Sequence, residues 1–194
     1  MANAFGIVAE FERRVSEYAG AKFGVAVDCC TSAIFLSLKY LRAVRVTIPH
    51  KTYISVPMAA IHAGVKVEFS REPWSGVYQL KPYPVFDGAK RFRRGMYQGG
   101  FHCLSFHAKK ILNIGRGGMI LTDDEKAVLW FRKARYDGRE GKPYDQERVS
   151  TLGWHCYMTP EQAARGLQLL DVLPENMPDQ KENYPDLRKM PVFA

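Results

Sequence analysis

Two adjacent lysines, Lys109 and Lys110, lie between two apolar runs in the stretch CLSFHAKKILNIGRGGMILT, residues 103–122. The apolar runs are typical of neighbouring core strands, and a surface turn between them accounts for one lysine. The other lysine is available for chemistry, because a lysine amine forms a Schiff base with carbonyl compounds. The glycines of IGRGG do not predict a nucleotide-binding P-loop, since the pattern G-x-x-x-x-G-K-[ST] is absent.

Polar and aromatic side chains also stand where other apolar runs end. They are Thr31 at the start of a predicted helix, Tyr53 after a predicted strand, Asp87 at the end of YPVFD, and Ser105 before the lysines. In parallel α/β sheets, ligands bind at the carboxyl ends of the strands. We therefore expect these side chains and a lysine to share one site.

These residue types together meet the requirements of a pyridoxal phosphate site. Such a site needs a lysine amine, a carboxylate that keeps the pyridine nitrogen protonated, and an aromatic face against the ring. It also needs hydroxyl and backbone N–H groups at a helix N-terminus for the phosphate. Each signal alone has an ordinary explanation as a turn former, a helix cap or a core aromatic. Their occurrence together, in this order, predicts pyridoxal phosphate binding.

Alternating strand and helix patterns predict the scaffold. Strands are expected over 24–27, 46–48 and 65–69, and helices over 7–18, 32–41, 53–62, 123–136 and 159–170, the last with Thr159 as N-cap. This order predicts an α/β fold of three layers, with a mostly parallel sheet and helices on both faces. Residues 1–172 are expected to form one domain, and residues 173–194 an extended or mobile tail.

Composition narrows the class of protein. The 194 residues are 46% hydrophobic and 25% charged, with a net charge of +8. No run of eighteen apolar residues and no secretory signal is present, and the four cysteines form no C-x-x-C pair or disulfide framework. We therefore expect a cytoplasmic protein with no membrane segment and no metal site. The positive charge is compatible with an anionic substrate, a basic surface or nucleic acid, but no zinc-finger or RNP-like pattern supports nucleic-acid binding.

Five blocks of the sequence resemble one family. They are EFERRVSEYAGAKFGVAVDCCTSAIFLSL, VTIPHKTYISVPMAAIHAGVKVEF, VFDGAKRF, LSFHAKKILNIGRGGMILTDDE and GWHCYMTPEQAARGL. In this order they resemble the nucleotide-sugar aminotransferases of the DegT/DnrJ/StrS type, which are fold-type I pyridoxal phosphate enzymes. The resemblance implies a homodimer that transfers an amino group, with glutamate as donor, to a nucleotide-linked keto sugar. It also implies a miniaturised large domain with the C-terminal small domain largely missing.

The resemblance implies a role for each site residue. The family's S-F-H-x-x-K motif begins at Ser105 and ends at Lys110, which makes Lys110 the Schiff-base lysine and Lys109 a variable position. The other implied cofactor contacts are Ser105, Thr31 and the backbone around Cys30 at the phosphate, Asp87 at the pyridine nitrogen, and Tyr53 against the ring.

Some positions depart from the family pattern. Cys30 stands where glycine is usual, and Lys90 replaces a His or Gln near the cofactor's phenolic oxygen. His155 replaces an asparagine that reaches a neighbouring subunit's phosphate, and Tyr157 replaces an arginine. The chain also lacks a strand–helix unit between residues 69 and 85. These departures keep an alternative open, a catalytically weak relative that binds the cofactor or a partner chain.

Overall fold

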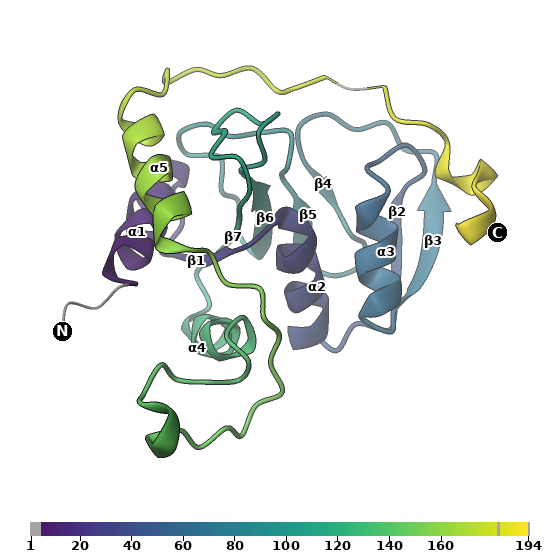
Figure 1. Cartoon of the computed structure of the whole chain (residues 1–194). Coiled ribbons are helices and arrows are strands. Elements are labelled where there is room, and N and C mark those ends of the chain that lie inside the picture. Colours follow the sequence, from purple (N-terminus) through teal and green to yellow (C-terminus); the bar gives the residue numbers. More distant parts are fainter. Residues whose placement is uncertain (1–4, 182, 194) are drawn as a thin grey trace.

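A five-stranded sheet forms the centre of the computed structural model, which describes residues 5–181 and 183–193. The strand order is β1-β7-β6-β5-β4, as Figure 1 shows. The strands are β1 (Phe23–Val27), β7 (Gly118–Thr122), β6 (Phe101–Ser105), β5 (Val85–Asp87) and β4 (Tyr78–Gln79). A separate parallel pair, β2 (Arg45–Pro49) and β3 (Lys66–Ser70), lies beside it.

The pairing of the central strands is mixed. β5 and β6 are parallel, whereas β7 runs antiparallel to both β1 and β6, and β4 runs antiparallel to β5. The predicted α/β class is confirmed, but the sheet is not mostly parallel. The reason lies in the connection between β6 and β7, residues 106–117, which contains no helix. Without a crossover helix, the chain returns antiparallel to the strand it has just left.

Helices cover both faces of this sheet. One face packs against α2 (Cys30–Tyr40) and α4 (Glu125–Ala134), and the other against α1 (Gly6–Ala19) and α5 (Pro160–Asp171). Helix α3 (Ser55–His62) packs against α2 and β3. Side chains of one strand alternate between the two faces. None of the helices within the described residues is long and apolar enough to cross a bilayer.

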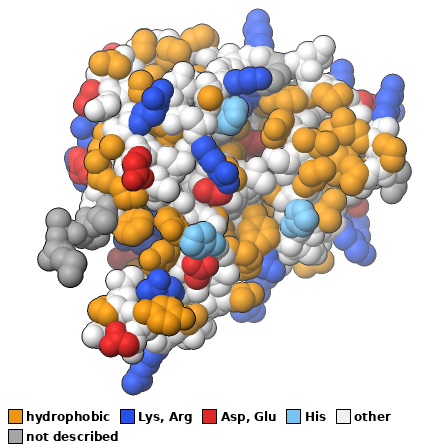
Figure 2. All heavy atoms as spheres, in the orientation of Figure 1, with side chains coloured by type: hydrophobic (Ala, Val, Ile, Leu, Met, Phe, Trp, Pro, Cys, Tyr) orange, Lys and Arg blue, Asp and Glu red, His pale blue; other side chains and the backbone are white. Residues whose placement is uncertain are grey.

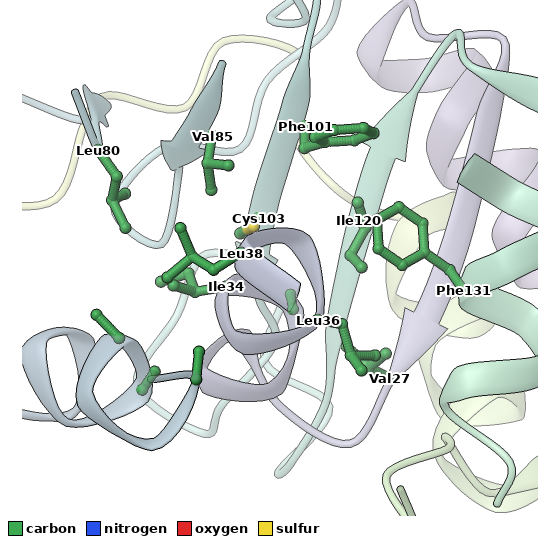
Figure 3. Packing of buried hydrophobic residues seen from close by; sticks show 14 of the residues in the cluster. Val27, Ile34, Leu36, Leu38, Leu80, Val85, Phe101, Cys103, Ile120 and Phe131 are labelled. Atoms are coloured by element: carbon green, nitrogen blue, oxygen red, sulfur yellow. The ribbon is translucent and has the colours of Figure 1, made fainter. Parts of the chain in front are cut away.

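Strand β7 illustrates this alternation. Ile120 belongs to the apolar cluster of α2 and α4, whereas Met119 and Leu121 belong to the cluster of α1 and α5. Figure 3 shows Ile34 and Leu38 of α2 directed toward the strands on the first face. Because both faces of the sheet are buried, its strands read as continuous apolar runs in the sequence.

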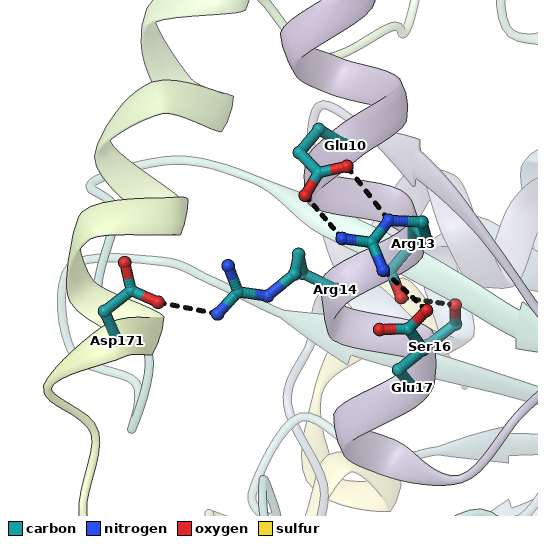
Figure 4. A network of polar contacts seen from close by, with 6 residues as sticks. All are labelled: Glu10, Arg13, Arg14, Ser16, Glu17 and Asp171. Carbon is teal, nitrogen blue, oxygen red and sulfur yellow. Dashed lines mark hydrogen bonds and ion pairs between the residues drawn. The ribbon is translucent and has the colours of Figure 1, made fainter.

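Helices α1 and α5 lie side by side, as the contacts between them require. An exposed ion pair joins Arg14 of α1 to Asp171 of α5 at 2.6 Å, while the other pairs drawn in Figure 4 lie within α1. Such exposed pairs stabilise by only about 0.2–1 kcal/mol. Packing sets the helix spacing instead, because a Cβ added at Gly166 would lie 2.5 Å from the ring of Phe11.

Most predicted helices and strands are present, with boundaries shifted by a few residues. The helix predicted over 53–62 begins at Ser55, and the one predicted over 123–136 is α4. Asp124 caps α4 by accepting a hydrogen bond from the backbone N–H of Ala127 at 3.0 Å. The predicted N-cap of α5 is confirmed at Thr159.

After α5 the chain crosses back over the molecule. Figure 1 shows this segment running from α5 to the side of β2 and β3. Its described residues form no α-helix and include two single 3₁₀ turns, Leu187–Lys189 and Pro191–Phe193. Its contacts, described below, place it across the loops that follow β2, β5 and β6.

The N-terminus of α2 lies directly against the start of β7. A Cβ added at Gly118 would clash with the carbonyl carbon of Cys29, the residue that caps α2. Only glycine lets the strand approach this closely. The contact fixes where the first turn of α2 stands relative to the end of the sheet.

We predict that Gly118→Ala destabilises the fold by about 1–3 kcal/mol, because the new methyl group overpacks a site bounded by backbone atoms. Urea unfolding followed by circular dichroism measures the change. Gly6→Ala is the matched control, since a Cβ at Gly6 meets nothing within 4 Å. Equal stability of Gly118→Ala and wild type would contradict the close contact.

Candidate functional site

A cavity of about 660 Å³ opens where β1, β5 and β6 end and β7 begins. We call it the lysine cavity. Seven of the eight predicted site residues line it, namely Cys30, Thr31, Tyr53, Asp87, Lys90, Ser105 and Lys110. They come from four separate segments of the chain, and the strand ends bring them together.

Asp87 is a buried carboxylate at the carboxyl end of β5, with 5% of its surface exposed. Its Oδ1 accepts a hydrogen bond from the backbone N–H of Ala89, and its Oδ2 accepts one from the hydroxyl of Tyr78, both at 2.9 Å. Burial raises the pKa of Asp87, while these donors and the cations of Lys110 and Lys90 act in the opposite direction. The carboxylate is thus held in a fixed orientation beside two amines.

Tyr78 and Thr52 form a second layer behind this carboxylate, and sequence reasoning missed both. Burial raises the pKa of Tyr78 well above its ordinary value, and the charge of Asp87 adds to this effect. The phenol therefore keeps its proton. That proton is donated to Asp87, and the hydroxyl of Thr52 lies 2.6 Å from the phenol oxygen. Thr52 therefore donates to Tyr78, and the chain of hydrogen bonds ends on Asp87.

Lys90 and Lys110 lie beside Asp87 in the lysine cavity, which Lys109 and Lys181 also line. Lys90 is only 6% exposed, and burial, followed by the positive charge of Lys110, lowers the pKa of Lys90 to about 8. The Nζ of Lys90 also lies 5.5 Å from the ring centroid of Tyr184. Lys110 is half-buried, whereas Lys109 is exposed at the rim. The adjacent lysines of the sequence thus differ in their surroundings.

Hydroxyl groups gather at the N-terminus of α2. The hydroxyls of Thr31 and Ser55 lie 2.8 Å apart, and Ser105 lines the same cavity. Backbone N–H groups in the first turn of a helix have no intrahelical acceptor, and the helix dipole favours an anion there. This end of the cavity is therefore suited to a phosphate. Ser55 was not predicted, because its position at the start of α3 looks like an ordinary helix beginning.

The thiol of Cys30 points away from these hydroxyls toward the sheet. Its Sγ lies 3.4 Å from the carbonyl oxygen of Cys103, which accepts its weak hydrogen bond, and 3.9 Å from Oδ1 of Asp87. Burial raises the pKa of the Cys30 thiol well above its ordinary value, and the charge of Asp87 adds to this effect. Cys30 is therefore a neutral thiol packed beside the carboxylate.

The segment after α5 covers part of the lysine cavity. We call its residues 179–181 and 183–187 the C-terminal strap. Asp179 forms a two-pronged ion pair with Arg91, at 2.5 and 2.8 Å, with both side chains about one-fifth exposed. The backbone N–H of Gln180 donates to the carbonyl of Lys90 at 2.9 Å. Leu187 is fully buried, so the strap is fastened at both ends.

Tyr184 of the strap faces into the lysine cavity among other aromatic rings. It is nearly parallel to Trp74, with 15° between the ring planes and 6.2 Å between centroids, and its centroid lies 6.2 Å from that of Tyr53. Burial raises the pKa of Tyr184 to about 12. Sequence reasoning missed Trp74 and Tyr184, because both lie in segments without periodicity.

His155 lies outside the lysine cavity. Its side chain is 70% exposed, and its Nδ1 is 2.9 Å from Oδ2 of Asp137. Its ring packs edge-on against Tyr157, with centroids 4.8 Å apart. A contact of His155 with a cofactor of a neighbouring subunit stays a prediction.

Charges on the surface are mixed in sign. Figure 2 shows Lys and Arg side chains interspersed with acidic and uncharged side chains on the face drawn. This face therefore lacks the continuous basic patch that nucleic-acid-binding surfaces present.

Comparison with known sequences finds a family profile and two relatives that each match most of this chain. The profile of the DegT/DnrJ/EryC1/StrS aminotransferase family matches residues 5–70 and 93–190. The chain is 24% identical to the GDP-perosamine synthase of Caulobacter vibrioides, over 88% of its own length and 58% of that protein. It is 26% identical to the spore coat polysaccharide biosynthesis protein SpsC of Bacillus subtilis, over 84% of its own length and 56% of that protein. The chain thus spans less than three fifths of either relative.

Solved structures share the fold. The sugar aminotransferase CalS13 from Micromonospora echinospora superposes with a TM-score of 0.72 at 19% identity, over 87% of this chain and 61% of that one. Together with the mixed sheet and its covering helices, this likeness identifies the scaffold as that of fold-type I aminotransferases, in a shortened form.

We predict that Asp179→Asn loosens the C-terminal strap, because it removes the charge of the ion pair with Arg91. Amide hydrogen exchange at Gln180 is expected to accelerate by about tenfold. Asp186→Asn is the matched control, because the carboxylate of Asp186 pairs with Arg188 within the same segment. Equal exchange in the two variants would show that the ion pair does not fasten the strap.

Proposed function

Because the chain belongs to the DegT/DnrJ/EryC1/StrS aminotransferase family, we propose that it is a pyridoxal phosphate-dependent aminotransferase. The proposed amino donor is glutamate, and the proposed acceptor is a keto sugar linked to a nucleotide. The observation that carries the proposal is the meeting of Lys110, Asp87 and the hydroxyls of Thr31 and Ser105 in one cavity. An amine, a buried carboxylate and an anion cradle are three separate requirements of this cofactor, and all are met there.

The residues present fit the cofactor. Thr31, Ser55, Ser105 and the first turn of α2 would hold its phosphate, Asp87 its ring nitrogen, and Tyr53 a face of its ring. When bound, pyridoxal phosphate supplies an electron sink that stabilises negative charge on the substrate carbon. The thiol of Cys30 leaves the hydroxyl end of the cavity open, since it is turned toward Cys103.

Asp87 is built to hold a proton on a neighbouring ring nitrogen. Its two hydrogen bonds fix the carboxylate, so its orientation does not have to reorganise when a cation approaches. Tyr78, which keeps its proton, donates to Asp87 and favours its charged form. A neutral residue at this position would leave the nitrogen without a partner for its proton.

Lys110 is the amine that attaches the cofactor and that, once released, accepts and returns a proton at Nζ. Only a neutral amine can attack a carbonyl carbon or accept a proton. The second buried amine in the cavity is Lys90, whose own pKa is lowered to about 8 by burial and by the charge of Lys110. Lys90 is also proposed to contact the cofactor, at the position where the family pattern is broken.

The quaternary state and location of the protein belong to the same proposal. By analogy with the family, we propose a homodimer in the cytoplasm. The strap across the lysine cavity and the altered residues Cys30 and Lys90 leave one alternative, a catalytically weak relative that binds the cofactor or a partner chain. In that alternative Lys110 still holds the cofactor, but glutamate has no access.

We predict that the wild-type protein, purified with pyridoxal phosphate, shows a visible absorption band from the lysine-bound cofactor. Lys110→Ala is expected to abolish the band, because the attaching amine is lost. Lys109→Ala is the matched control and should retain it, since Lys109 is exposed at the rim. Absence of a band in the wild type would refute cofactor binding.

Glutamate distinguishes the enzyme from the alternative. Added to the wild type without a keto acid, it is expected to bleach the visible band as the amino group passes to the cofactor. A stable band after glutamate addition would favour the protein without turnover.

A further inference from the structure

One side chain of the C-terminal strap, Tyr184, lines the lysine cavity. The centroid of its ring lies 6.2 Å from those of both Trp74 and Tyr53, and 5.5 Å from Nζ of Lys90. The phenol keeps its proton, because burial raises the pKa of Tyr184 to about 12 and the charge of Asp87 adds to this effect. The strap therefore places a neutral aromatic ring among the residues proposed to contact the cofactor.

The space between Tyr184 and Tyr53 is too narrow for a further ring. Non-bonded carbon atoms pack best at about 3.5–4.0 Å, so a flat ring held between two others needs about 7–8 Å between their centres. The two centroids are only 6.2 Å apart, with 58° between the ring planes. A planar ligand that lies between Tyr53 and the strap therefore requires Tyr184 to move.

Polar contacts fasten the strap on the N-terminal side of Tyr184. Asp179 pairs with Arg91 through two hydrogen bonds. The side-chain Nε2 of Gln180 donates to the carbonyl of Lys109 at 3.0 Å, which ties the strap to the loop after β6. This side of the strap is thus held by charged and polar groups, whose attraction weakens as salt concentration rises.

An apolar contact fastens the strap on the other side of Tyr184. Leu187 is fully buried, and its backbone N–H donates to the carbonyl of His50 at 2.9 Å. Release of this attachment exposes a leucine to water, which is costly, whereas release of Asp179 and Arg91 exposes charged groups that water solvates. The strap is therefore expected to open on the Asp179 side and to stay attached at Leu187.

We propose that the C-terminal strap is an autoinhibitory lid: Tyr184 blocks the part of the lysine cavity beside Tyr53 to planar ligands, and release of the strap at Asp179 opens it. The lid acts on any planar ligand that reaches Lys110. It depends on the proposed function only for the identity of that ligand, which would be pyridoxal phosphate. Any change that breaks the pairing of the strap with Arg91 therefore speeds entry.

Labelling with trinitrobenzenesulfonate, a planar reagent that attacks neutral amines, tests the lid in the full chain before cofactor is added. Mass spectrometry follows the label on Lys110 relative to that on Lys109, which is exposed at the rim. Tyr184→Ala is expected to raise this ratio about tenfold, because labelling no longer depends on local opening of the strap. Tyr144→Ala is the matched control and should leave the ratio unchanged, since Tyr144 is exposed and lies outside the cavity.

Two further variants separate the parts of the lid. Tyr184→Phe keeps the ring and is expected to label as slowly as the wild type, because the ring and not the hydroxyl fills the space. Asp179→Asn keeps Tyr184 and is expected to raise the labelling ratio, because the strap opens more often. An unchanged ratio in Tyr184→Ala or in Asp179→Asn, each shown to be folded by circular dichroism, would overturn the lid. A Tyr184→Phe variant that labels like Tyr184→Ala would overturn it as well.

The visible band reports separately on pyridoxal phosphate. If the strap is a lid, the band is expected to appear faster after mixing in Tyr184→Ala than in the wild type. A raised labelling ratio without any band would refute the proposed function and retain the lid. A band that forms at equal rates in both proteins, together with equal labelling ratios, would overturn the lid and retain the proposed function.

Discussion

Burial of the Asp87 carboxylate is the constraint on which this site depends. A charge taken out of water is costly unless donors and cations surround it. The chain meets this requirement with a backbone N–H two residues away, a phenol from the neighbouring strand, and two amines. These groups come from three segments, so the burial of one carboxylate constrains the loops after β5 and β6 and the short strand β4.

The topology of the sheet makes this convergence possible. Parallel β5 and β6 end at the same edge, and antiparallel β7 begins there. The N-terminus of α2 reaches the edge as well, because Gly118 lets β7 approach Cys29. The cavity is thus made by the strand order and by one small residue, while side chains and the backbone N–H groups at α2 and Ala89 determine its chemistry.

The sequence was sufficient to predict Asp87, Ser105, Thr31 and one of the two lysines as neighbours, because apolar runs mark strands and ligand sites follow strand ends. The choice of Lys110 over Lys109 came from the resemblance to the family's S-F-H-x-x-K motif. Tyr78 could not be predicted, since β4 is two residues long and such a strand has no period to detect. Trp74 and Tyr184 could not be predicted either, because they meet through a contact between segments far apart in the chain. The direction of β7 was missed for a related reason, because strand patterns do not encode whether a neighbour is parallel.

The position of the C-terminal strap in the chain has a consequence for biosynthesis. Proteins emerge from the ribosome N-terminal end first and begin to fold during synthesis. All strands of the described sheet and every residue proposed to bind the cofactor precede α5, whereas Asp179, Tyr184 and Leu187 follow it. The nascent chain therefore passes through a stage in which the cavity is assembled but uncovered, and a small molecule can be loaded before translation supplies the cover.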